Sequence, residues 1–207
     1  MNWYKKAVNS LFDTQNIPKN PNSPGPNPNA EQLYNYIKSK NLKIQTYHGT
    51  TLANFQSAQK DGYLLYGGRV GKNLRGSKKD FVYVSTIKGV AAKYANKFAA
   101  NSQADPNARV ENMTAVVVPI LVPLYAIAEL RGIIFGGILG QNENIYHDDL
   151  KNFMEDTLNN NNQEQAVQKI YAELSKQEEL TVYLGLPLKW MNGNMEVVKV
   201  FNKIDWL

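Results

Sequence analysis

The chain has 207 residues, of which 43% are hydrophobic and 20% are charged, a composition typical of a globular protein with one substantial core. It contains no cysteine, which excludes disulfides, thiolate zinc sites and a cysteine nucleophile, and with only two histidines a multi-histidine metal site is not expected. The net charge of +5 favours anionic partners, but an excess of this size is more typical of a solvated surface than of a nucleic-acid interface.

The N-terminal sequence has lysines after its aromatic residues and lacks an apolar stretch of signal-peptide length. The longest apolar stretches, 114–130 and 131–140, are interrupted by prolines or charges and fall short of the roughly 20 residues that span a membrane. We therefore expect no membrane partner, and a protein that is cytoplasmic or exported by a route that needs no classical signal peptide.

The first dozen residues have apolar side chains at helical spacing, which predicts an amphipathic helix. A stretch rich in proline and asparagine follows at 16–31 and predicts a linker. We accordingly divide the chain into a helix and linker at 1–30 and a folded domain at 31–207. A short helix with Leu33, Tyr34 and Ile37 on one face is expected to open this domain.

Two strand-to-helix units are predicted next. Residues 43–48 alternate as a strand, Thr50 or Thr51 can cap the following helix, and Gly62 can end it. A Gly-rich basic loop at 65–80 leads into a second strand at 81–86, after which Ser85 or Thr86 is expected to cap another helix. The predicted buried face of that helix comprises Val90, Ala91, Tyr94 and Phe98.

The remaining sequence predicts three more strands and a helical segment. Residues 113–121 form a continuous apolar run, typical of a strand buried on both faces. Residues 125–178 are predicted to be largely helical, and strands are predicted at 180–188 and 196–204. About five strands with helices before, between and after them indicate the α+β class. The helical segment is then an insertion between strands.

Familiar nucleotide-binding and hydrolase motifs are missing. The stretch at 67–73 lacks the glycine spacing and the hydroxyl of a P-loop, and no G-x-G-x-x-G lies between a strand and a helix. The chain also has no G-x-S-x-G nucleophile elbow.

One combination of residues is more informative. A Tyr-His-Gly-Thr sequence ends the strand at 47–50, a Tyr-x-Ser-Thr sequence ends the strand at 83–86, and a further tyrosine follows on a helix at 94. With the apolar strand and a last strand that begins at Glu196, this set resembles the catalytic core of His-Tyr-Glu type ADP-ribosyltransferases, the superfamily of diphtheria toxin and the poly(ADP-ribose) polymerases. The resemblance covers roughly 45–100, 114–124 and 180–201.

The resemblance implies an α+β ADP-ribosyltransferase fold, with a split mixed or antiparallel β-sheet, flanking helices and a helical insertion at about 125–178. It also implies that NAD is a consumed co-substrate. By position, His48 would hydrogen-bond the adenosine ribose, Tyr83 and Tyr94 would flank the nicotinamide, and Gly49 would contact the nicotinamide amide through its backbone. The implied NAD-binding set also contains Thr50 and Ser85.

The resemblance assigns the catalytic acid less directly. Glu196 fits best, because an apolar strand ending in Leu-Pro and a polar turn precede it, in the order found in diphtheria toxin. Glu179 is the rival if the strand that follows it is the glutamate-bearing strand. Glu129, after the third strand, is the third choice.

The chemistry is consistent with these residue types independently of the family. Cleavage of the bond between ribose and a pyridinium ring develops oxocarbenium character, so a carboxylate beside the ribose stabilises the transition state. Aromatic faces suit the cationic ring.

We therefore expect a mono-ADP-ribosyltransferase that modifies a macromolecule, with protein favoured over nucleic acid as the acceptor. Within this family such a chain would act in the cytoplasm or as an effector or toxin delivered to a host cell. An NAD glycohydrolase, or an inactive NAD-binding module of the same fold, is the alternative.

Overall fold

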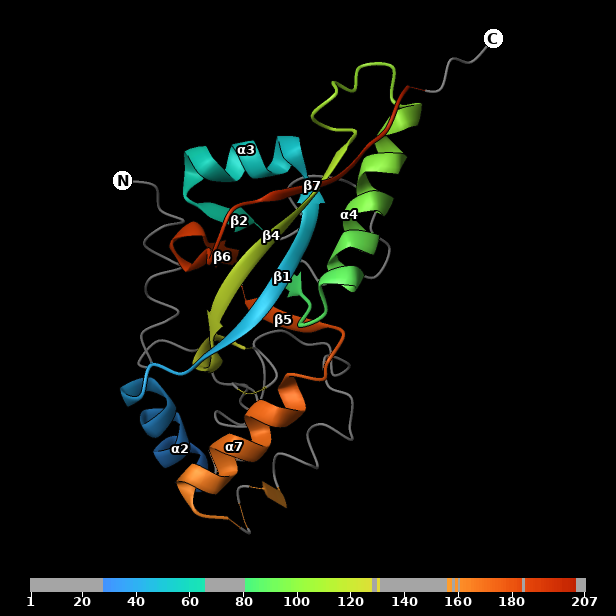
Figure 1. Ribbon diagram of the computed structural model, residues 1–207. Coiled ribbons are helices and arrows are strands. Elements are labelled where there is room, and N and C mark those ends of the chain that lie inside the picture. The colour runs from blue at the N-terminus through green and yellow to red at the C-terminus, as the bar shows by residue number, and fades with distance from the viewer. Residues whose placement is uncertain are drawn as a thin grey trace, which may run out of the picture. The chain divides into compact units, whose positions relative to one another are not determined.

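A computed structural model describes residues 28–65, 81–127, 130, 156–157, 159, 161–183 and 185–203 (Figure 1). The predicted N-terminal helix, most of the linker, nearly all of the basic loop, much of the helical insertion and Glu129 lie outside these residues. The chain divides into two compact units, each built from two stretches of sequence. The first comprises Met1–Ile44 and Pro123–Ser175, and the second comprises Gln45–Val122 and Lys176–Leu207.

The described part of the first unit is mainly helical. Helix α2 (Pro28–Ser39) packs against α7 (Gln163–Leu174) and against the short 3-10 helix η4 (Leu124–Ala126). Asn162 caps α7, because its side chain accepts a hydrogen bond from the Gln165 backbone N–H at 3.0 Å. The buried apolar side chains include Leu33, Tyr34, Ile37, Leu124, Ile170 and Leu174. The predicted face of the first helix of the domain is therefore confirmed.

The second unit contains the strands. The three-stranded sheet has the order β1 (Lys43–Thr51), β4 (Thr114–Pro123) and β7 (Glu196–Val200), with β4 and β7 antiparallel. Two antiparallel pairs accompany it: β2 (Tyr63–Leu65) with β6 (Gly185–Pro187), and β3 (Phe81–Val84) with β5 (Leu180–Tyr183). Helices and antiparallel sheets together confirm the α+β class.

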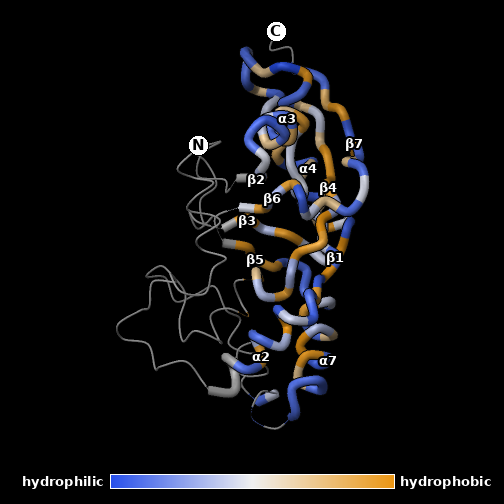
Figure 2. The backbone as a smooth tube through the Cα atoms, turned by 90° about the vertical axis from the view of Figure 1, so that its left-hand side faces the viewer, coloured by the Kyte–Doolittle hydropathy of each residue, from blue (hydrophilic) through white to orange (hydrophobic). Residues whose placement is uncertain are grey.

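Strand β4 forms the middle of the three-stranded sheet. Eight of its ten residues are buried, on both faces, as the continuous apolar run predicted. Figure 2 shows this run as a largely hydrophobic stretch of the backbone tube. The predicted strand at 180–188 instead forms β5 and β6, and the short β2 that pairs with β6 was not predicted.

Helix α3 (Leu52–Asp61) follows β1 without a loop. The Thr51 side chain accepts a hydrogen bond from the Asn54 backbone N–H at 3.4 Å, so Thr51 is the N-cap. Gly62 ends the helix in the left-handed region with φ of 79°, which glycine adopts without steric cost. Both predicted helix boundaries are confirmed.

Helix α4 (Lys88–Asn101) differs from its prediction at two points. Its N-cap is Ile87, with no side-chain capping bond; neither Ser85 nor Thr86 holds that position. Its buried face is formed by Ala91, Ala95 and Ala99, whereas Tyr94 is 42% exposed. The predicted face is confirmed for Ala91 and wrong for Tyr94, because large side chains suggested burial whereas close approach to the sheet selects the smallest ones.

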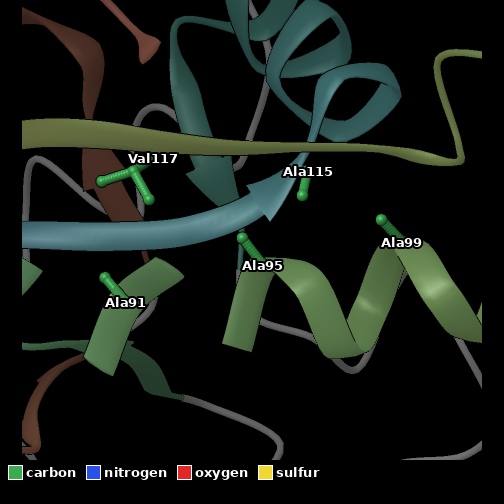
Figure 3. Close-up of a cluster of buried hydrophobic side chains, with 5 residues drawn as sticks. All are labelled: Ala91, Ala95, Ala99, Ala115 and Val117. Carbon is green, nitrogen blue, oxygen red and sulfur yellow. The ribbon is translucent and has the colours of Figure 1, made fainter. Parts of the chain in front are cut away.

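The close approach of α4 is visible in Figure 3, where the alanine methyl groups of the helix point toward the sheet. They form a cluster with Ala115 and Val117 of β4. A side chain at Gly49 of β1 would place its Cβ 1.9 Å from the Ala91 carbonyl oxygen and 3.0 Å from the Ala95 nitrogen. Only glycine therefore lets the helix backbone lie this near the strand.

Within the part of the chain that the structure describes, no helix has the length and apolar character needed to cross a bilayer.

Candidate functional site

His48 lies in β1 with its ring partly buried. Its Nδ1 is 2.8 Å from the backbone carbonyl oxygen of Tyr83, and a carbonyl can only accept a hydrogen bond. The ring therefore carries its proton on Nδ1 and presents Nε2 as an acceptor. Burial lowers the pKa of His48 from its ordinary value, and the bond to Tyr83 opposes this shift in part. The imidazole is consequently neutral at neutral pH, and its Nε2 can accept a hydrogen bond from a ligand hydroxyl.

Tyr83 and Tyr94 come from β3 and α4. The Tyr94 hydroxyl donates to Oε2 of Glu179 at 3.3 Å. The pKa of Tyr94 is raised, mainly because the negative charge of Glu179 opposes ionisation; partial burial, the hydrogen bond and the charges of Glu178 and Tyr83 act in the same direction. The Glu179 carboxylate is therefore the main electrostatic influence on the Tyr94 hydroxyl.

The position of Glu179 follows from the pairing of β3 with β5. Leu180, the first residue of β5, pairs with Val84, and Thr181 pairs with Tyr83. Glu179 immediately precedes this ladder, so its backbone lies beside the end of the tyrosine-bearing strand. Glu179, the second choice of acid from the sequence, is thus the carboxylate that the fold places beside Tyr94.

Glu196 begins β7, as predicted, but it has a different partner. Its Oε2 lies 2.6 Å from the Lys88 Nζ at the start of α4, and the two side chains are 55% and 49% exposed. Strand β4 lies between β7 and the His48-bearing β1 in the sheet. An exposed ion pair of this kind contributes little to stability. No described contact joins Glu196 to His48, Tyr83 or Tyr94.

The smaller residues of the implied site are buried and have structural contacts. Gly49 accommodates α4, and the Thr50 hydroxyl lies 3.3 Å from the Asn54 side-chain nitrogen. Ser85 accepts a hydrogen bond from the Ile87 N–H at 3.0 Å. Its backbone exchanges two hydrogen bonds with Tyr47, at 2.7 and 2.9 Å, which join β1 to the end of β3. These contacts hold the His48 and Tyr83 strands together.

Sequence analysis missed one hydrogen bond that bears on this site, between Thr86 and Gln177. The Thr86 hydroxyl donates to the Gln177 backbone carbonyl at 2.8 Å. The sequence predicted Thr86 as a possible helix cap. The pairing of β3 with β5 places Thr86 beside residue 177 instead. The one sequence feature that could have assigned Thr86 to the site was its position directly after the Tyr-x-Ser sequence.

The site residues comprise two tyrosines, a carboxylate that contacts one of them, and a histidine that is a hydrogen-bond acceptor. Such a set can bind a cationic ring against the aromatic faces and stabilise positive charge that develops nearby. Comparison of the chain with protein-family models, curated proteins and solved structures found no match.

Proposed function

We propose that the protein is an ADP-ribosyltransferase that cleaves the bond between nicotinamide and ribose in NAD and transfers ADP-ribose to a macromolecule. The observation that carries the proposal is the hydrogen bond between Tyr94 and Glu179 beside the strand of Tyr83, whose backbone also holds His48. These are the residue types that the resemblance to the His-Tyr-Glu family requires.

Glu179 is the acid in this proposal, and Glu196 takes second place. Both glutamates are exposed, but Glu179 lies within hydrogen-bond range of one of the two tyrosines assigned to the nicotinamide, whereas Glu196 is paired with Lys88. A carboxylate acts on the developing oxocarbenium ion only from nearby, because the stabilisation of charge falls with distance.

Each side chain has a role in the proposed reaction. Tyr83 and Tyr94 hold the pyridinium ring, and the His48 Nε2 accepts a hydrogen bond from a ribose hydroxyl. The bond between the ribose C1′ and the ring nitrogen breaks, and its electron pair leaves with neutral nicotinamide. Glu179 stabilises the positive charge on the ribose. The acceptor nucleophile then forms its bond to C1′ and loses its proton to solvent or a nearby base.

The proposal is tested by incubating the protein and a cell lysate with NAD labelled in the adenylate or in the nicotinamide. Wild-type protein should release nicotinamide and transfer adenylate label to a macromolecule. The Glu179→Gln variant should lose roughly 10²–10³-fold in rate, as when a group that stabilises transition-state charge is removed. The matched Glu196→Gln variant should stay within a few-fold of wild type, because it removes only an exposed ion pair.

Other outcomes lead to defined alternatives. Free ADP-ribose without labelled macromolecule would identify an NAD glycohydrolase, with water as the acceptor. Binding of NAD without release of nicotinamide would identify a binding module. Loss of activity in Glu196→Gln but not in Glu179→Gln would reverse the choice of acid.

A further inference from the structure

We propose that Thr86 is a positioning residue that fixes the location of Glu179 relative to Tyr94. This inference rests on the proposed function in giving Glu179 a catalytic role, but the geometric claim is separate. It starts from the 2.8 Å hydrogen bond from the Thr86 hydroxyl to the Gln177 carbonyl, which joins residues 91 positions apart.

The hydrogen bond of Thr86 acts on a short segment with a second anchor. On one side of Glu179, Leu180 pairs with Val84 in the β3–β5 ladder. On the other side, Gln177 is held by Thr86. Glu179 therefore lies between two attachments, and both lead back to the chain at the end of β3.

The contacts around Thr86 explain why this hydroxyl is available. The N-cap of α4 is Ile87, and the N–H of Ile87 is bonded by Ser85. Thr86 thus takes no part in capping, although a threonine before a helix commonly does so. The three consecutive residues have separate roles, and the hydroxyl of Thr86 is directed to the segment that carries the acid.

Loss of this hydroxyl should affect Glu179 more than the fold. Without this bond, the segment 177–179 loses its hydrogen bond to Thr86 and keeps the pairing of Leu180 with Val84, so the carboxylate can move away from the Tyr94 hydroxyl. A displacement of about 1 Å of a catalytic group can cost roughly 10²-fold in rate, because the reaction depends on its alignment. We expect a fall in kcat with little change in KM for NAD, since His48 and the tyrosines keep their places.

The titration of Tyr94 measures the position of Glu179 directly. Tyr94 faces Glu179, Glu178 and Tyr83, and the Glu179 charge is the largest cause of its raised pKa. The pKa can be followed by NMR of protein labelled with ¹³C in the tyrosine rings, with the signal assigned from Tyr94→Phe. Glu179→Gln gives the value expected when this charge is absent.

The decisive comparison is Thr86→Val, which keeps the shape without the hydroxyl, against Thr86→Ser, which keeps the hydroxyl. In Thr86→Val the Tyr94 pKa should fall toward the Glu179→Gln value and kcat should fall about 10- to 100-fold. Thr86→Ser should retain both. Thr86→Ala, in which no methyl group replaces the hydroxyl, is the second variant if Thr86→Val does not fold.

An unchanged Tyr94 pKa in a folded variant without the hydroxyl would overturn the proposal. The NMR measurement needs no turnover, so it decides the role of Thr86 even if wild-type protein does not cleave NAD. Conversely, wild-type turnover that is unaffected in Thr86→Val would refute the positioning role and leave the proposed function intact.

Discussion

At the scale of single residues, His48 shows how one hydrogen bond selects a chemical state. The Tyr83 carbonyl accepts from Nδ1, so the neutral ring offers Nε2 to a ligand. The sequence placed this histidine at the end of a strand, but it could not show the partner, because Tyr83 reaches it only through the pairing of Tyr47 with Ser85. The resemblance therefore predicted a ligand role without predicting the tautomer.

The lowered pKa of His48 predicts a pH dependence of stability. In the unfolded chain the ring takes up a proton near 6.5, whereas the folded protein resists protonation to a lower pH. The free energy of unfolding should thus be highest above this value and should fall as the pH drops below 6.5, until the folded pKa is reached. Urea unfolding of wild type and His48→Asn across this range measures the difference.

The His48→Asn variant keeps a donor near Nδ1 and removes both the titration and the Nε2 acceptor. The difference in stability between wild type and variant should therefore vary with pH in the window below 6.5, and the second histidine is common to both. A difference that is constant with pH would contradict the prediction. His48→Gln is the control: its amide lies near the position of Nε2 and not of Nδ1, so this variant weakens the hydrogen bond to the Tyr83 carbonyl, which His48→Asn keeps.

At the scale of elements, the packing of α4 against the sheet depends on small residues. The helix contacts the sheet through alanines, and β1 contributes Gly49 where the two backbones come closest. Sequence periodicity found the helix but assigned its buried face to the larger residues, including Tyr94. The distance between a helix and the sheet it packs on is set by tertiary structure, so helical spacing in the sequence does not predict it.

The Gly49→Ala substitution should destabilise the protein by roughly 1–3 kcal/mol or more, the usual cost of overpacking, because the new Cβ meets backbone atoms rather than a movable side chain. Gly89→Ala, near the start of α4, is the matched control, since nothing lies within 4 Å of its added Cβ. Alanine there should be neutral or should stabilise by about 0.5–1 kcal/mol.

Urea unfolding at constant pH measures both glycine variants. Equal stability of Gly49→Ala and wild type would mean that α4 can move away from β1 without cost. Such a result would contradict the close approach of the α4 backbone to Gly49.

At the scale of the whole molecule, the candidate site is built from distant parts of the sequence. His48, Tyr83 and Tyr94 come from the first stretch of the second unit, and Glu179 comes from its last stretch, after the chain has formed α7 of the first unit. Local patterns predicted β1, β4 and β7 and the caps of α3, because caps and periodicity are local. They left the acid undecided, since strand pairing between distant stretches determines which glutamate meets Tyr94.

This division predicts where NAD should stabilise the molecule, given the proposed function. A ligand that binds only the folded second unit slows the openings of that unit by the factor 1 + [L]/Kd, so amide exchange should become about 100-fold slower at 100 times Kd. The amides of β1, β3, α4 and β5 should show this protection, and those of α2 and α7 should show less. Hydrogen exchange followed by mass spectrometry, with and without NAD, resolves these segments.

The His48→Asn variant is the control for this measurement, because it should lose the added protection while keeping its exchange pattern without NAD. Protection that begins in α2 and α7 would place the binding site in the first unit. Since His48, Tyr83, Tyr94 and Glu179 all belong to the second unit, that result would contradict the assignment of every one of them to the NAD site. Protection confined to the second unit but preserved in His48→Asn would remove only the histidine from the site.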